Sequence, residues 1–104
     1  MKLVICNVPT EQARQIAKHL VDSRVAGCVN ILPPAASVYR WDNEVVEESE
    51  SPLLIKTTAD GLPRLRDVLL EIHPYDVPEI IALNLDEAGS HAPYLKWLSD
   101  NVVA

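Results

Sequence analysis

The hydrophobic residues of this chain fall into two patterns, short apolar runs and stripes spaced by three or four positions. Apolar runs bounded by turn residues predict strands. They lie at 2–8, at 28–32 resuming at 37–41 after Pro33-Pro34, at 44–58 and at 80–85. Spaced stripes predict helices with one apolar face. Such stripes cover 13–21 and 62–72, and a shorter one follows Gly89-Ser90.

The order of these segments is β-α-β-β-α-β with an additional C-terminal helix. This is the split β-α-β order of ferredoxin-like α+β sandwiches, in which both helices cover one face of a four-stranded antiparallel sheet. The length of 104 residues and the 48% share of apolar residues fit one domain over residues 1–104. We therefore expect a single ferredoxin-like domain.

Turn and cap residues refine this prediction. Thr10 is expected to cap the first helix and Asp60 the second. Asp42-Asn43 is typical of a two-residue hairpin turn, because Asn tolerates positive φ. Pro52 cannot donate to a central ladder, so it predicts a bulge or an edge within the long strand at 44–58.

The length of that strand predicts more than one subunit. About 15 residues at about 3.4 Å each span about 50 Å. A compact domain of this size has a diameter of only about 34 Å. The hairpin around Asp42-Asn43 should therefore extend beyond the sheet and expose Tyr39 and Trp41 on one side of the pleat. Pairing with another subunit is the ordinary way to cover such an edge.

Charge and composition exclude several classes of protein. The net charge of −6 and the lack of any Lys/Arg cluster argue against a nucleic-acid partner. The apolar start ends at Asn7, too early for a signal peptide or a membrane span. We therefore expect a cytoplasmic protein whose Cys6 and Cys28 are reduced thiols. The three isolated glycines form no phosphate loop or dinucleotide fingerprint, so enzymatic activity and an organic cofactor are not expected.

The stretch His73–Glu79 stands out between the second helical stripe and the last strand. Two prolines make it stiff, and it holds an imidazole, a phenol and two carboxylates. One proline is enough to stop a helix. This concentration of polar groups therefore predicts a site in addition to a junction.

Five blocks of sequence identify a family. They are Cys28-Val29-Asn30-Ile31, Ser37-Val38-Tyr39-Arg40-Trp41, Leu54-Ile55-Lys56-Thr57, His73-Pro74-Tyr75 with Pro78-Glu79-Ile80, and Tyr94-Leu95 with Trp97-Leu98. With these blocks in this order, the chain resembles the CutA divalent-cation-tolerance proteins along nearly its whole length. The resemblance implies ferredoxin-like subunits in a tight homotrimer, a design shared with PII-like signalling proteins. It also implies a bacterial cytoplasmic setting and a role linked to copper and other divalent metals. Asn43, where the family usually has glycine, and Pro52 depart from its pattern.

The resemblance also implies metal ligands. Copper binding in this family is associated with a cysteine at the end of the first strand and the histidine of His-Pro-Tyr, which are Cys6 and His73 here. Thiolate and imidazole suit copper. Ile72 stands where some relatives carry a second histidine. The alternatives are that Cys6 is a small buried hydrophobic residue and that His73 interacts as a cation with the end of its helix.

A second candidate site is an inter-subunit cleft. Lys56, Tyr75 and Glu79 would converge there, with Trp41 as an apolar wall, on a small anionic or polar ligand. The alternative is a structural ion pair between Lys56 and Glu79. The acidic residues Glu44, Glu47, Glu48 and Glu50 are expected to form a solvated hairpin.

Together these observations predict a cytoplasmic homotrimer that binds Cu²⁺ or another divalent metal and acts in metal tolerance. The alternative is a PII-like signalling or scaffold module that holds a small molecule or a protein partner at the subunit cleft.

Overall fold

The computed structural model describes residues 1–104, which form five strands and three helices around a mixed α+β core. The elements are β1 (Lys2–Val8), α1 (Ala13–Asp22), β2 (Cys28–Ile31), β3 (Ala35–Trp41), β4 (Glu44–Thr57), α2 (Leu62–Ile72), β5 (Ile81–Asn84) and α3 (Ala92–Asp100). A 3₁₀ turn, η1 (Thr10–Gln12), precedes α1. The predicted order of strands and helices is confirmed except that the segment predicted as one interrupted strand forms two, β2 and β3.

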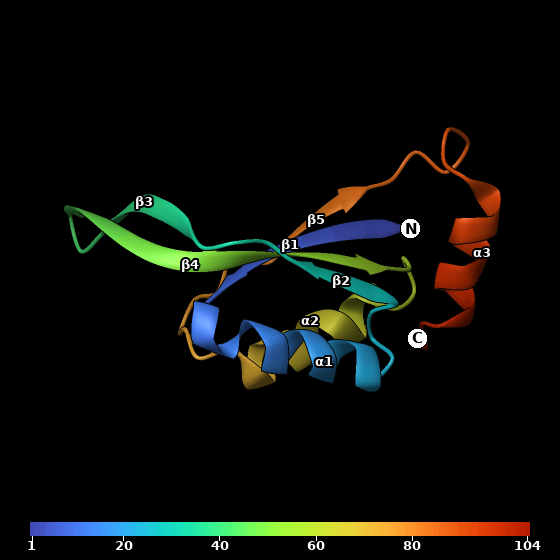
Figure 1. Cartoon of the computed structure of the whole chain (residues 1–104), viewed down its shortest axis with the longest axis horizontal. Helices are drawn as coiled ribbons and strands as arrows, with labels where there is room; N and C mark the ends of the chain where they lie inside the picture. The colour runs from blue at the N-terminus through green and yellow to red at the C-terminus, as the bar shows by residue number, and fades with distance from the viewer.

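The sheet is antiparallel throughout, with strand order β2-β4-β1-β5 and with β3 paired to the first half of β4. Helices α1 and α2 lie on one face of it, and α3 lies at the end opposite the β3–β4 hairpin (Figure 1). The hairpin extends well past the helices and accounts for a long axis of 45 Å against 27 and 22 Å. The predicted overshoot of this ribbon is therefore confirmed.

The hairpin turn has the geometry that its sequence predicts. Asp42 and Asn43 both have positive φ, 49° and 64°. Two successive residues of this kind form the turn whose twist matches that of the flanking strands. The register Trp41↔Glu44 follows from it and places Tyr39, Trp41 and Glu48 on one face of the ribbon.

The segment predicted as one interrupted strand is two strands, so the sheet has five strands and not four. On one side of β4 the register is Ile31↔Leu53, and farther along it is Ala35↔Glu50. Residues 32–34 therefore face only two residues of β4, and the ladder contains a bulge there. Pro33-Pro34 causes this break because neither proline can donate a hydrogen bond.

Pro52 lies opposite this bulge, so the ladder does contain a bulge at Pro52 as predicted, but the extra residue belongs to the facing segment 32–34 and not to β4. Pro52 stays in register with Asn7 of β1, so β4 itself runs without a bulge. Its carbonyl accepts the Leu32 N–H at 3.0 Å. The nitrogen and the carbonyl of one strand residue point to the same side, so the missing donor faces the bulge, where no ladder bond is lost.

Both predicted helix caps were wrong. Thr10 opens the 3₁₀ turn behind Pro9, and its Oγ1 accepts a hydrogen bond from Ser51 Oγ at 3.0 Å. The chain before α2 turns through Thr58, whose Oγ1 accepts the Gly61 N–H at 2.9 Å. The Thr10 hydroxyl is taken up by a tertiary contact with Ser51, and the hydroxyl at the start of α2 belongs to Thr58, two residues before the predicted Asp60.

The two faces of the sheet differ in burial. The face under α1 and α2 holds the core: its fully buried side chains include Val4, Cys6, Leu53 and Ile55. Alternate residues of the same strands point to the other face, which α1 and α2 leave uncovered (Figure 1). There Leu3, Ile5 and Leu54 are half-buried, while Ile81 and Leu83 stay 50% and 43% exposed.

None of the helices combines the length and the apolar composition needed to cross a bilayer.

Candidate functional site

The junction between α2 and β5 lies against the root of the hairpin. Helix α2 ends at Ile72, and His73 takes an extended conformation, with φ −71° and ψ 132°, as a residue before proline must. Its N–H still closes the last turn on the Leu69 carbonyl at 2.8 Å. The two prolines thus fix the path on which the polar residues of the junction are displayed.

His73 is buried, with 7% of its surface exposed, and both of its ring nitrogens have partners. Nδ1 accepts the Tyr75 N–H at 3.1 Å, and Nε2 lies 2.8 Å from the Asn7 carbonyl. Because a backbone N–H only donates, Nδ1 must carry a lone pair, and Nε2 carries the proton that Asn7 accepts. His73 therefore ties the junction to the end of β1 and does not reach the carbonyls of its own helix.

Cys6 lies in the core and meets His73 at the same carbonyl. Its side chain is fully buried, and Sγ lies 3.9 Å from the Asn7 oxygen. Burial first, and then the charges of Glu79 and Glu50, raise the pKa of the Cys6 thiol from 9.0 to about 12. The thiol is therefore protonated at neutral pH and behaves as a small hydrophobic residue.

The structure thus brings the two predicted copper ligands to one place, but there both of them contact the Asn7 carbonyl oxygen. Cys6 and His73 converge on Asn7, yet no group of three or more His, Cys, Asp or Glu side chains is arranged to hold a metal ion. A metal bound to this pair would have to displace the proton of the thiol and the hydrogen bond of Nε2.

A pocket of about 680 Å³ lies between the junction and the hairpin. We call it the junction pocket. Its walls come from the end of β1, from β3 and β4, and from residues 74–79. The lining residues are Asn7, Ser37, Val38, Tyr39, Trp41, Glu48, Glu50, Pro74, Tyr75, Asp76, Val77 and Glu79. Three are aromatic, four are acidic and none is Lys, Arg or His.

Three of the four predicted cleft residues line this pocket: Trp41, Tyr75 and Glu79. Lys56 does not. It lies opposite Leu3 of β1, four residues from Asn7, which is about 13 Å along a strand.

Lys56 has other partners within the subunit. Its ammonium donates to the Asn30 side chain and lies 3.8 Å from Cys28 Sγ. The alternative of an ion pair with Glu79 is not formed within the subunit, where Asn7 Nδ2 is the partner of that carboxylate at 3.5 Å. A contact of Lys56 with the cleft of another subunit stays a prediction.

Glu50 is the main residue that the sequence analysis misjudged. It was grouped with the solvated hairpin, but only 7% of it is exposed, and its Oε2 accepts a hydrogen bond from Tyr75 Oη at 3.0 Å. Burial first, and then the hydrogen bond and charge of Glu50, raise the pKa of the Tyr75 phenol. The sequence does indicate this position of Glu50: a two-residue turn at Asp42-Asn43 sets the register that puts Glu48 and Glu50 on the same face of the hairpin as Tyr39 and Trp41.

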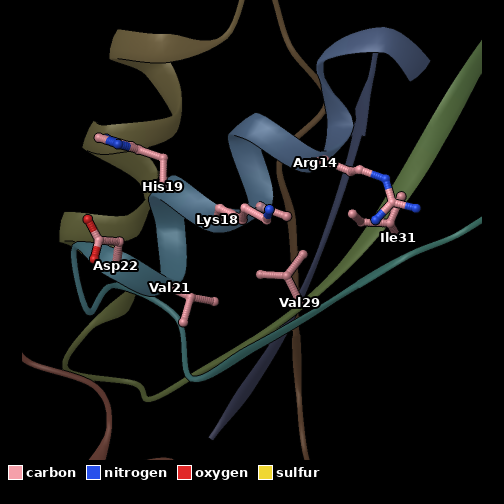
Figure 2. Close-up of a pocket in the computed structure, with 8 residues that line it drawn as sticks. Arg14, Lys18, His19, Val21, Asp22, Val29 and Ile31 are labelled. Carbon is pink, nitrogen blue, oxygen red and sulfur yellow. The ribbon is translucent and has the colours of Figure 1, made fainter.

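A second, shallower hollow of about 600 Å³ lies between α1 and the edge strand β2. Figure 2 shows Arg14 and Lys18 extending from the helix on the side of Val29 and Ile31, whereas His19 and Asp22 point away. It contains none of the predicted site residues. His19 is an exposed residue of α1.

Comparison with known proteins agrees with these blocks and this fold. Residues 2–101 match the family model described as CutA1 divalent ion tolerance protein. The chain belongs to the CutA1 family. It is 48% identical over 101 residues to the divalent-cation tolerance protein CutA of Thermus thermophilus, covering 96% of each chain. The solved structure of the Thermus thermophilus protein superposes with a TM-score of 0.93 over 99% of this chain and 100% of that one.

Other CutA relatives extend the comparison. The PII-like protein CutA from Nostoc sp. PCC 7120, solved in apo form, is 33% identical and superposes with a TM-score of 0.95, covering 99% of this chain and 98% of that one. Human CutA is 40% identical over 91 residues, which are 86% of this chain but 50% of the human protein. This CutA1 chain thus spans nearly the whole Thermus protein and about half the length of the human one.

Proposed function

We propose that this CutA1 protein is a cytoplasmic, non-catalytic homotrimer that acts in divalent-cation tolerance by binding cations. The observation that carries the proposal is the junction pocket, where Glu48, Glu50, Asp76 and Glu79 gather without a basic side chain. Such a pocket attracts positive charge. The names of the relatives point the same way, since the Thermus protein is described as a divalent-cation tolerance protein.

The homotrimer is proposed from the uncovered face of the sheet. Its apolar rows run Ile81–Ile5–Leu54 and Leu83–Leu3 across three strands, and at about 25 cal/mol per Å² their burial is a strong driving force. The projecting hairpin supplies further surface. Light scattering should give three times the mass of one chain; the mass of one chain at micromolar concentration contradicts the proposal.

We assign the metal, Cu²⁺ or another divalent ion, to Cys6 and His73, which both adjoin Asn7 at the wall of the junction pocket. Neutral imidazole and thiolate are the binding forms. Ligation through Nε2 of His73 would require its proton to move to Nδ1, and it would break the hydrogen bonds of the ring to the Asn7 carbonyl and to the Tyr75 N–H. The free energy needed to deprotonate the buried Cys6 thiol is the main cost that opposes metal binding. Copper stands high enough in the Irving–Williams order to displace such a proton.

Calorimetric titration with Cu²⁺ tests this assignment. Cys6→Ser and His73→Ala should each weaken binding at least tenfold, while Cys28→Ser and His91→Ala, at a half-buried and an exposed position, serve as matched controls. Equal affinity and stoichiometry in all four variants would remove Cys6 and His73 from the site. Binding lost only in Cys28→Ser would move it to the open face of the sheet.

The alternative function, a PII-like module for a small molecule or a protein partner, is favoured by the shape of the pocket. A volume of about 680 Å³ with aromatic walls is typical of small-molecule sites and exceeds the space that a bare metal ion fills. Thermal shift tests it, because a ligand that binds only the folded protein raises the melting temperature. A shift with copper and with no organic compound would leave the metal function alone.

A further inference from the structure

The junction pocket lacks an internal counter-ion for its carboxylates. Four of its twelve lining residues are acidic and none is basic. The ion pairs of the subunit lie elsewhere, between the N-terminal amine and Glu87 and between Lys96 and Asp100. The negative charge of the pocket is therefore not neutralised within the subunit.

Glu50 is the buried carboxylate of the pocket that has no positively charged partner within the subunit. The residue is more than nine-tenths buried, and the hydrogen bond to its Oε2 comes from a neutral donor, the Tyr75 hydroxyl, at 3.0 Å. A buried carboxylate is unfavourable unless a positive charge accompanies it. A single hydrogen bond from a hydroxyl offsets only part of the hydration that the buried carboxylate has lost, so the carboxylate is suited to a positively charged ligand.

The aromatic walls decide which kind of cation fits. Tyr39 and Trp41 lie on the same face of the hairpin as Glu48 and Glu50, and in the single subunit they keep 38% and 54% of their surface exposed. Ring faces attract organic cations but do not coordinate metals. A divalent metal held by carboxylates needs several oxygen ligands at one point, and no three His, Cys, Asp or Glu side chains of the subunit converge in that way.

We infer that the junction pocket binds a small organic cation, such as a quaternary ammonium or a protonated amine, between the Glu50 carboxylate and the rings of Tyr39 and Trp41. This rests on the alternative function above, in which the pocket holds a small molecule. A cationic ligand differs from the small anionic or polar ligand that the sequence analysis expected, because within the subunit Lys56 lies outside the pocket.

Choline and 3,3-dimethyl-1-butanol form a suitable pair of probes, since they have nearly the same shape and differ in charge. Choline should raise the melting temperature of the protein and bind measurably in calorimetry. The neutral alcohol should bind at least tenfold more weakly. Agmatine extends the test to protonated amines, and citrate represents the anions.

Two isosteric variants locate the site. Glu50→Gln removes the buried charge and keeps an acceptor for Tyr75, so choline affinity should fall at least tenfold. Glu47→Gln removes the same charge from the opposite face of the hairpin and should leave choline affinity unchanged. Circular dichroism and light scattering of Glu50→Gln confirm that a loss of binding is not a loss of fold or assembly.

Each result has a distinct meaning. Equal binding of choline and the alcohol, or binding of citrate instead, would overturn the cationic ligand while leaving a small-molecule pocket. Choline binding that survives Glu50→Gln would overturn the assignment to this site. Absence of binding by all four probes, with Cu²⁺ still bound, would overturn the organic ligand and leave the metal function standing.

Discussion

The buried thiol of Cys6 predicts how stability depends on pH. Its pKa is raised from 9.0 to about 12, chiefly by burial, so the folded protein holds this proton more tightly than the unfolded chain does. Between these values the unfolded chain releases the proton and the folded protein keeps it. The stabilisation is therefore complete below pH 9.0 and is lost as the pH rises toward 12.

The size of the effect follows from the shift. At about pH 10.5 the solution is about 1.5 pH units above the pKa of the unfolded thiol, whereas at about pH 8 that thiol is still protonated. At about 1.4 kcal/mol per pH unit, raising the pH over this interval lowers the free energy of unfolding by about 2 kcal/mol. Other groups titrate in the same range, so the comparison with Cys6→Ala isolates the thiol. Wild type should lose about 2 kcal/mol more than Cys6→Ala over this interval.

Urea unfolding at each pH measures the free energy of unfolding of wild type and of Cys6→Ala. The protein concentration is kept fixed, because the stability of an oligomer depends on it. Cys28→Ser is the matched control and should keep the full loss of the wild type, because Cys6 is intact. Parallel curves for wild type and Cys6→Ala would refute the reasoning. The same proton also makes copper binding through Cys6 stronger as the pH rises, which calorimetry at two pH values checks.

Three further substitutions test the fold and the assembly. Tyr75→Phe leaves the buried Glu50 carboxylate without its donor and should lower stability by about 1–3 kcal/mol in urea unfolding; an unchanged midpoint contradicts this. Asn43→Val forces a β-branched residue to φ 64° and should destabilise the hairpin by about 1–2 kcal/mol, measured in the same way. Leu83→Glu on the open sheet face should reduce the mass in light scattering to that of one chain, whereas Leu70→Glu, 55% exposed on α2, should not.

Much of the fold could be predicted because its signals are local. The alternation of β1, the stripes of α1 and α2 and the Asp42-Asn43 turn each depend on residues a few positions apart. Two prolines, which fix their own φ and restrict the residue before them, likewise made the His73–Glu79 junction recognisable as a stiff connector. The register of the hairpin follows from the turn alone, and it already placed Glu50 beside the aromatic rings.

The chain by itself therefore determined the family, the order of elements, the overshooting hairpin and the members of the junction. The tertiary structure decided what depends on residues far apart in sequence. It placed the bulge at residues 32–34 opposite Pro52, joined Cys6 and His73 through Asn7, and separated Lys56 from Glu79. Burial of Glu50 by Tyr75 is of the same kind: desolvation is set by everything that packs around a group, so no local pattern contains it.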